Sequence, residues 1–400
     1  MRRIPAALVP AIAALSLVTA CTGPDQGAPP TGGPPPATET RPGPPAGPTT
    51  LPETGATIAR LELTMARAGH TATLLPDGRV LVAGGCTLDG CGGTPAGGRT
   101  EIFDPRRQRF EPGPAMVRAR AGHTATALKD GRVLFVGGWP DEGRPPLASI
   151  EVFDPRSGRF TEVASMATGR GGHTATRLTD GRVIIVGGVG GRTALSSVEI
   201  FDPATNRLAP ATALPAPKAT HGAARLTDGR VLVAGGQTGV GHGVALTETA
   251  LIYDTDSDRW KDIRGLSRPT YKLAVAALPG GGALVVGGQL ADDPAARLAT
   301  TEIYDHLAGA FRPGPTMSER RYKISDAVVA LPDGRVVIAG GFGVDVYHRG
   351  RVSRVEGSTG VERQSPAAVA LNDGTVLVTG GYDDRTRVTA SAVLVDPRTS

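Results

Sequence analysis

The chain has 400 residues, of which 56 are glycine and 34 proline, while only 4% are aromatic. So much glycine excludes a helical bundle, because glycine costs about 1 kcal/mol at each helix-interior position, and a hydrophobic share of 40% excludes disorder throughout. The formal charge of +5 is carried without any basic run, which argues against a nucleic-acid partner. A turn-rich β protein is the expectation that remains.

Residues 1–20 have the pattern of a secretion signal. Arg2 and Arg3 precede an apolar run over residues 4–18, which is short for a bilayer span and is followed by small residues. The tetrapeptide that ends in Cys21 resembles the lipobox of bacterial lipoproteins, in which the cysteine is lipidated and becomes the mature N-terminus. We therefore expect a chain anchored outside the cytoplasm to the bacterial cell membrane through a lipid on Cys21. A plain signal peptide with an incidental cysteine is the alternative.

Residues 21–56 are expected to form an extended tether. From residue 22 to residue 56 there are eleven prolines, seven glycines and no aromatic side chain. Such a segment cannot bury a core, and its prolines favour extended polyproline II conformations. A folded domain is expected from residue 57 to residue 400.

This domain consists of one unit repeated seven times. The first copy contains Gly-His-Thr-Ala-Thr at 69–73, Asp-Gly-Arg-Val at 77–80 and a glycine pair at 84–85. The first glycines of the successive pairs are Gly84, Gly137, Gly187, Gly235, Gly287, Gly340 and Gly380. Regular self-similarity at this period is the signature of a repeat architecture.

Each copy predicts four short strands. In the first copy the strand over 71–75 is turned by Asp-Gly into a second strand over 79–83, and Asp-Gly between apolar runs is a strong hairpin signal. A third strand ends at 101–105, and a fourth runs from Phe110 toward Met116. Four strands in about 50 residues form one propeller blade. The glycine pair, the strand number and the unit length resemble the kelch repeat over residues 57–397, which implies an all-β, seven-bladed kelch-type β-propeller.

The last copy stops after its third strand, which leaves the seventh blade one strand short. Residues 57–63 precede Met65 in the way that fourth strands precede the other methionines. We expect this N-terminal strand to pair beside residues 392–396 and to close the ring.

One face of the propeller is expected to carry any binding site. Strand direction alternates, so the connections between strands 2 and 3 and between blades share a face, called here the loop face. It holds the long segments 86–100, 139–149, 189–197, 237–250 and 289–301, and binding residues concentrate on such loops. Blade 6 lacks most of its loop, which predicts a notch in the rim.

Aromatic and basic side chains gather on this face, and most of them belong to blades 5 to 7. Eleven aromatic residues repeat within strands and are interpreted as packing residues, whereas five lie beside the loops. Amphipathic rings there suit stacking on a sugar or peptide, with capping of the central channel as the alternative. The candidate ligand-binding residues are Trp139, Tyr271, Lys272, Arg320, Arg321, Tyr322, Lys323, Phe342 and Tyr382.

Four copies place a histidine at the start of the first strand and a cation three residues earlier. These are His70, His123, His173 and His221, with Arg67, Arg120, Arg170 and Lys218. They either form a cationic ring at the channel mouth or serve the blade structurally, by bonding the neighbouring blade's backbone. The matching histidine positions in blades 5, 6 and 7 are predicted to be Leu273, Asp326 and Pro366.

Cys86 and Cys91 lie in the first long loop. A close pair outside the cytoplasm is expected to be a disulfide, and free thiols or a metal pair are the alternatives. No further cysteine is near enough to complete a zinc site.

Some kelch propellers are enzymes, so their catalytic motifs are compared with the residues of this sequence. The copper site of the galactose oxidase type needs two tyrosines, two histidines and a cysteine, and Tyr347-His348 falls in a third strand instead. The Ser-x-Asp-x-Gly-x-Thr-Trp box of sialidase propellers is absent. Loop carboxylates could bind calcium or simply be solvated, namely Asp292, Asp293, Asp383 and Asp384.

The sequence therefore predicts a lipid-anchored, extracytoplasmic and monomeric binding module for a cell-envelope protein or glycan. No catalytic residue, cofactor or metal is assigned. The alternative is a sugar-acting enzyme of the periplasmic sialic-acid epimerase kind, which also uses a kelch propeller.

Overall fold

The computed structural model describes residues 53–398, apart from 92–97, 141–143, 242–243 and 359. The secretion signal, Cys21 and most of the expected tether lie outside the described residues. Within the described part of the chain, no helix is long and apolar enough to cross a membrane. That part contains only strands and two short 3-10 helices, Asp89–Cys91 and Pro294–Ala296.

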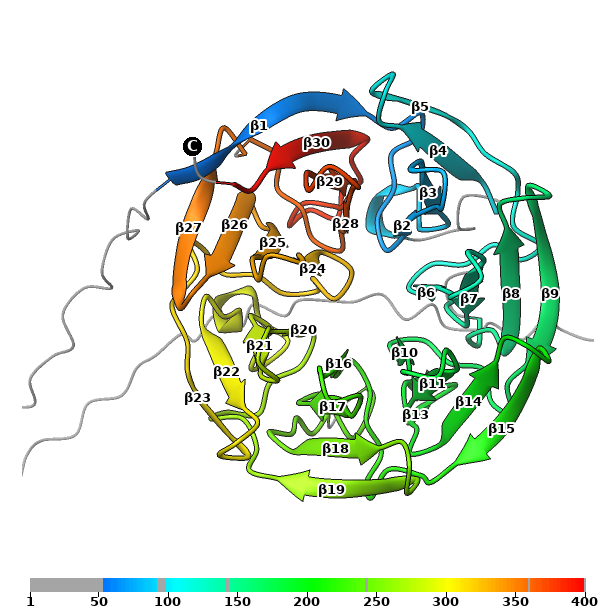
Figure 1. The fold of residues 1–400 in the computed structure, drawn as a ribbon, viewed down its shortest axis with the longest axis vertical. Coiled ribbons are helices and arrows are strands. Elements are labelled where there is room, and N and C mark those ends of the chain that lie inside the picture. The colour runs from blue at the N-terminus through cyan, green and yellow to red at the C-terminus, as the bar shows by residue number, and fades with distance from the viewer. Residues whose placement is uncertain (1–52, 92–97, 141–143, 242–243, 359, 399–400) are drawn as a thin grey trace, which may run out of the picture. The chain divides into compact units, whose positions relative to one another are not determined.

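The described strands form seven blades arranged in a ring around a central axis (Figure 1). Blades 1 to 3 consist of β2 (Thr71–Leu74), β3 (Val80–Ala83), β4 (Thr100–Asp104) and β5 (Arg109–Pro112); β6 (Thr124–Ala127), β7 (Val133–Val136), β8 (Ser149–Asp154) and β9 (Arg159–Ser165); and β10 (Thr174–Arg177), β11 (Val183–Val186), β14 (Val198–Asp202) and β15 (Arg207–Ala211). A small hairpin of β12 (Val189–Gly190) and β13 (Thr193–Ala194) stands in the loop of blade 3.

Blades 4 to 7 continue the same order. They consist of β16 (Gly222–Arg225), β17 (Val231–Ala234), β18 (Ala250–Asp254) and β19 (Arg259–Ile263); β20 (Ala274–Ala277), β21 (Ala283–Val286), β22 (Thr301–Asp305) and β23 (Ala310–Pro313); β24 (Val328–Ala330), β25 (Val336–Gly340), β26 (Gly343–His348) and β27 (Arg351–Glu356); and β28 (Ala367–Ala370), β29 (Val376–Thr379), β30 (Ser391–Asp396) and β1 (Glu53–Glu62). The first strand of each blade lies nearest the axis in Figure 1. The kelch-type, seven-bladed prediction is confirmed.

The N-terminal strand closes the ring as expected. β1 pairs antiparallel with β30, and Arg60 lies opposite Val393. Its first residues also pair in parallel with β27 of blade 6, where Glu53 lies opposite Arg354. β1 begins four residues before the expected position 57, and it joins blades 6 and 7 into one eight-stranded sheet.

The core lies between the blades. Second strands are wholly buried, and their alternate side chains face opposite neighbours because side chains alternate across a strand. In β3, Val80 and Val82 pack with Leu377 of blade 7, while Leu81 packs with Phe135 of blade 2. Every blade thus shares its core with both neighbours.

The glycine pairs stand where blades meet most closely. A Cβ on Gly84 would lie 2.4 Å from the carbonyl oxygen of Arg120 in the next blade, and one on Gly85 would lie 2.7 Å from the Ala68 oxygen. Both have a positive φ, 66° and 89°. Only glycine satisfies both constraints, which explains the conspicuous repeat.

Candidate functional site

The loop face is hollowed at blade 6, as the missing loop predicts. A pocket of about 450 Å³ lies there. Its floor is the β25–β26 hairpin, in which only Gly341 and Phe342 separate the two strands. Pro294 and Arg297 of the blade 5 loop and Asp384 of the blade 7 loop also line the pocket. The pocket is therefore a notch between two longer loops.

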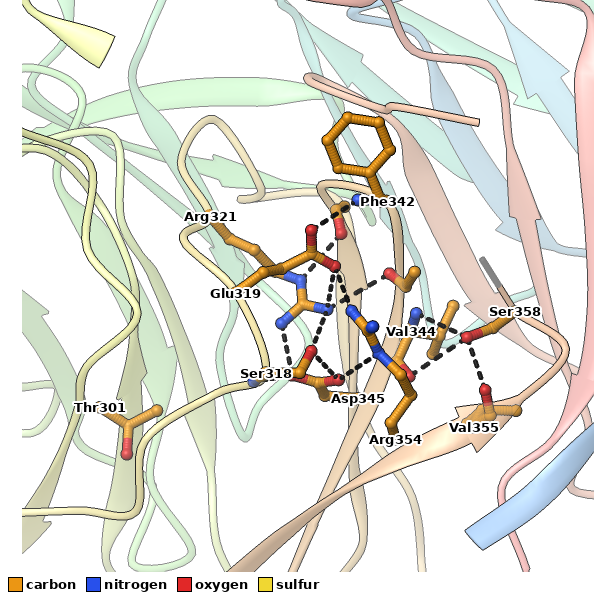
Figure 2. Close-up of polar contacts among 12 residues, drawn as sticks. Thr301, Ser318, Glu319, Arg321, Phe342, Val344, Asp345, Arg354, Val355 and Ser358 are labelled. Carbon is orange, nitrogen blue, oxygen red and sulfur yellow. Dashed lines mark hydrogen bonds and ion pairs between the residues drawn. The ribbon is translucent and has the colours of Figure 1, made fainter. Parts of the chain in front are cut away.

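Phe342 stands at the tip of this hairpin and is 53% exposed. Its backbone N–H donates to Glu319 over 2.8 Å, and the ring points away from the polar groups beneath it (Figure 2). Gly341 supplies the positive φ of 62° that so tight a turn requires. An exposed aromatic ring at the edge of a pocket offers a stacking surface.

A buried ionic network supports the hairpin from below (Figure 2). The guanidinium of Arg321 donates to Asp345 and, over 3.1 Å, to Glu319. Arg354 donates to the same Glu319 over 2.7 Å. Burial by itself would raise the pKa of Asp345, but Arg321 and Ser318 hold that pKa below its ordinary value. The network lies within blade 6 and is suited to fixing the pocket's shape.

One wall is a polar chain that joins blades 5, 6 and 7. Arg297 forms an ion pair with Asp384 over 2.6 Å and lies 4.3 Å from the centroid of the Tyr322 ring. The Tyr322 hydroxyl donates to the Gln364 side chain, which in turn donates to Asp384. The hydrogen bond from Arg297 lowers the pKa of Asp384, and the carboxylate accepts from both Arg297 and Gln364.

Two lysines also lie near the Tyr322 ring. The ammonium groups of Lys272 and Lys323 lie 5.8 and 5.4 Å from the Tyr322 ring centroid. Lys272 lies 4.4 Å from the Tyr271 ring centroid, and Lys323 donates to the Tyr382 hydroxyl. Cations at these distances from aromatic faces are attracted to them.

The structure divides the nine candidate residues into three sets. Arg320, Arg321, Tyr322 and Phe342 line the pocket, although Arg321 is consumed by the ionic network. Tyr271, Lys272, Lys323 and Tyr382 adjoin it through Tyr322. Trp139 lies apart in blade 2, where a Cβ on Gly171 would come within 2.4 Å of its ring. Trp139 therefore packs over the chain of blades 2 and 3.

Sequence reasoning missed most of the pocket's polar lining, which comprises Arg297, Glu319, Glu362, Arg363 and Gln364. The loop carboxylates have separate partners: Asp292 pairs with Lys272, Asp293 caps a 3-10 helix, Asp383 pairs with Arg387 and Asp384 with Arg297. Among the described residues, no group of three His, Cys, Asp or Glu could hold a metal ion.

The repeated basic residues are structural, and the cationic-ring interpretation is wrong. Arg120 is fully buried, donates to the Gly137 carbonyl and pairs with Glu151 over 2.6 Å, all within its own blade. His123 instead contacts the neighbouring blade, 3.1 Å from the Thr71 hydroxyl. The prediction that these residues bond the neighbouring blade's backbone is therefore not met: the arginine bonds within its own blade, and the histidine bonds a neighbouring side chain.

Burial, reinforced by Arg120, lowers the pKa of His123 to about 3, so the ring is neutral at pH 7. Equivalent His–Thr contacts follow at His173 and His221. In blade 6 the histidine position falls at Ile324, which follows the left-handed Lys323, and the predicted match to Asp326 is two residues off.

The copper chemistry of oxidase propellers does not fit these residues. Tyr347 is buried in β26, and His348 ends that strand on the face opposite the pocket. Each of the four repeated histidines is bonded to a threonine. The predicted disulfide involves the side chain of Cys91, which lies outside the described residues, so it stays a prediction.

Seven blades of repeated glycine-pair units define a β-propeller of the kelch class. A family model, the KLHDC2/KLHL20/DRC7 Kelch-repeats domain, matches residues 69–288. The chain belongs to the kelch-repeat family. Among curated proteins, no match was found.

Solved structures show the same fold. A fungal alcohol oxidase of the AA5 family, in complex with copper, is 16% identical and superposes with a TM-score of 0.66. The match covers 86% of this chain and 77% of that one. At this identity the likeness concerns the fold alone, and 910 chains match to a significant degree, so fold likeness does not select a function.

Proposed function

We propose that this protein is a lipid-anchored, extracytoplasmic binding module that holds a cell-envelope glycan or protein in the blade 6 pocket without catalysing a reaction. The observation that carries the proposal is the pocket itself, which is concave, of small-ligand size and bordered by the exposed Phe342 ring. Hydrogen-bond donors and acceptors stand side by side in it, which suits the hydroxyl groups of a sugar better than an apolar ligand.

The pocket's shape agrees with the enzyme alternative, but the acidity of its Asp384 carboxyl group does not. A concave pocket agrees with a sugar-acting enzyme, but such chemistry also needs a carboxyl group with a raised pKa inside it. The pKa of Asp384 is lowered instead. Desolvation raises the pKa of Asp326 to about 6, but Asp326 does not line the pocket. Binding without turnover is therefore the better-supported function.

A binding experiment tests this proposal. Residues 22–400 would be immobilised and presented with solubilised envelope glycans and proteins, with Phe342→Ala as the pocket variant and Trp139→Ala as the matched aromatic control. We expect retention by the wild type and by Trp139→Ala, and loss of at least tenfold in Phe342→Ala. Equal retention by all three chains would remove the pocket from the function.

The anchor is tested separately in cells. We expect the wild type to fractionate with membranes and to carry a lipid on Cys21 detectable by mass spectrometry of the mature N-terminus. A Cys21→Ser variant is expected to lose the lipid. A wild-type N-terminus without lipid would contradict the anchor and leave the binding proposal standing.

A further inference from the structure

A ring of left-handed residues encircles the loop-face end of the inner strands. At each blade the residue before the histidine position has φ between 50° and 61°, and these residues are Gly69, Gly122, Gly172, Thr220, Lys272, Lys323 and Ser365. At six of the seven junctions between blades, the backbone N–H of this residue donates to the carbonyl of the equivalent residue in the preceding blade. The bond from Lys323 to Lys272, over 2.9 Å, is one example. The left-handed conformation is thus shared by all seven positions, and six such hydrogen bonds join them.

Side chains at such positions are unfavourable. A left-handed backbone crowds any Cβ, so glycine is preferred there. Blades 1 to 3 follow this preference, whereas blades 5 and 6 place lysine at two adjacent positions of the ring. Strain of this kind, when localised, points toward function.

The two lysines add a second cost, which is electrostatic. Burial and then the neighbouring Lys323 charge lower the pKa of Lys272. Among the described residues, Lys272 forms an ion pair with Asp292 alone, at 3.4 Å; the Asp292 side chain is 91% exposed, which makes the pair weak. Within the described part of the chain, Lys323 forms no ion pair with a carboxylate, and its ammonium rests on tyrosine rings. The cluster thus brings together two positive charges, of which Lys272 has one exposed carboxylate partner and Lys323 is held by the Tyr382 hydroxyl.

We propose that Lys272 and Lys323 form an anion subsite beside the blade 6 pocket, and that the ligand is an acidic saccharide. Its carboxylate or sulfate group would lie between the two ammonium groups, and its neutral, hydroxylated part would enter the adjoining pocket that Tyr322 lines. This inference rests on the proposed binding function and specifies its ligand.

The pocket's own charges favour a saccharide over an acidic peptide. Glu362 and Asp384 line the pocket and accept hydrogen bonds. Sugar hydroxyl groups can donate to these carboxylates, whereas a run of acidic side chains would be repelled by them. Tyr322 lines the pocket, and its ring centroid lies 5.8 and 5.4 Å from the two ammonium groups, so it can contact both parts of one ligand.

Replacing both lysines by glycine distinguishes a loss of binding from a loss of stability, because the two effects should have opposite signs. Lys272→Gly with Lys323→Gly removes both charges and also relieves the left-handed strain, so we expect a raised Tm together with weaker binding. The probes are oligogalacturonides, sialylated oligosaccharides and heparin oligosaccharides, measured by titration calorimetry at low salt with residues 22–400. At least one acidic saccharide should bind, with affinity at least tenfold lower in the double variant and lower still at high salt for the wild type.

The matched control is Thr220→Gly with Ser365→Gly, which relieves the same backbone strain in blades 4 and 7 and removes no charge. We expect it to raise Tm and leave binding unchanged. Carboxyl-reduced oligogalacturonide lacks the anionic group and should bind more weakly than oligogalacturonide. Inorganic sulfate should compete with the acidic saccharide for the lysine subsite.

Three results would overturn the subsite. These are equal saccharide affinity in the lysine double variant, no binding of any acidic saccharide, or tighter binding of polyglutamate than of any saccharide. Failure of the subsite and failure of the proposed function are distinguishable. If Phe342→Ala abolishes binding of an envelope ligand that the lysine variant still binds, the pocket function stands and only the acidic ligand class is lost.

Discussion

At the scale of single residues, the basic side chains divide into those that hold the blades and those available to a ligand. Arg120 and Glu151 are both fully buried and bonded to each other, and Glu151 also accepts the backbone N–H groups of Val117 and Arg118. Removing one partner of such a pair leaves an uncompensated buried charge. Arg320, in contrast, is exposed and donates to the Ala295 carbonyl, so it can exchange that contact for a ligand.

Glu151→Gln is expected to lower the free energy of unfolding by about 3 kcal/mol, because Arg120 would stay buried without its countercharge. The matched control is Glu302→Gln in blade 5, where Thr270 replaces the buried cation and Glu302 contacts Ser267 instead. Its cost should stay below about 1 kcal/mol. Urea unfolding measures both, and equal losses would contradict the assigned role of the pair.

Blades 1 to 3 carry a partial signal for this pairing in the sequence. Each has arginine three residues before the histidine and glutamate at the start of the third-strand motif, while blade 4 has Lys218 and Leu251 at these positions. The correlation breaks down in later blades, because blade 5 keeps Glu302 with Thr270 and blade 7 has a buried Arg363 with Val393. No comparable repetition marks Arg297 and Asp384, because their pairing depends on how far two unique loops lean across blade 6.

At the scale of strands and blades, the histidines couple each blade to the next. The His–Thr contact recurs between first strands of successive blades and, for His70, reaches Thr379 of blade 7. Blade 5 replaces the histidine by Leu273, which packs near Gly235 of the preceding blade. The contact between neighbouring blades at this position is therefore polar where a histidine is present and apolar in blade 5.

This coupling predicts a loss of stability in acid. The folded-state pKa of His123 is about 3, below its ordinary value of 6.5, because burial disfavours the charged ring. Its contribution to stability is complete above pH 6.5 and is lost as the pH falls toward 3, since the unfolded chain takes up the proton first. His123→Leu should flatten the fall in unfolding free energy between pH 6 and 4 by about 1.4 kcal/mol per pH unit.

Thr71→Val is the control for this experiment. It removes the hydroxyl partner and keeps His123 buried, so we expect a loss of about 1 kcal/mol at every pH with the slope retained. Urea midpoints at several pH values measure both variants. A wild-type slope in His123→Leu would contradict the burial assigned to the ring.

At the scale of the whole molecule, the features that could be predicted from the sequence are those that recur from blade to blade. Asp-Gly turns and glycine pairs recur in the copies, so blade number, face assignment and the notch at blade 6 followed from the chain alone. The unpaired third strand of the last copy even required β1 (Glu53–Glu62) to close the ring. The pairing of Glu53 and Ala56 with β27 could not be predicted, because it happens once and crosses a blade boundary.

Ring closure by β1 predicts that stability depends on one face of this strand. Ala59 and Leu61 pack on the core between blades 7 and 1, whereas Ile58 is 49% exposed. Leu61→Asp is expected to lower the Tm by several degrees or more, because a carboxylate would enter apolar surroundings, while Ile58→Asp should change it little. Thermal unfolding followed by circular dichroism compares the two.

Truncation tests the same closure by removing the strand. A chain that begins at residue 63 would expose the edge of β30 (Ser391–Asp396) and lose roughly 1 kcal/mol for each strand hydrogen bond. Exposed edges also template pairing between molecules, so we expect oligomers in light scattering where a chain beginning at residue 53 stays monomeric. Equal Tm and mass for both chains would mean that the ring closes without β1. Because the expected tether enters the fold through this strand, any force transmitted from the proposed membrane anchor would act first on the pairing of Glu53 with β27 and then on the β1–β30 pairing.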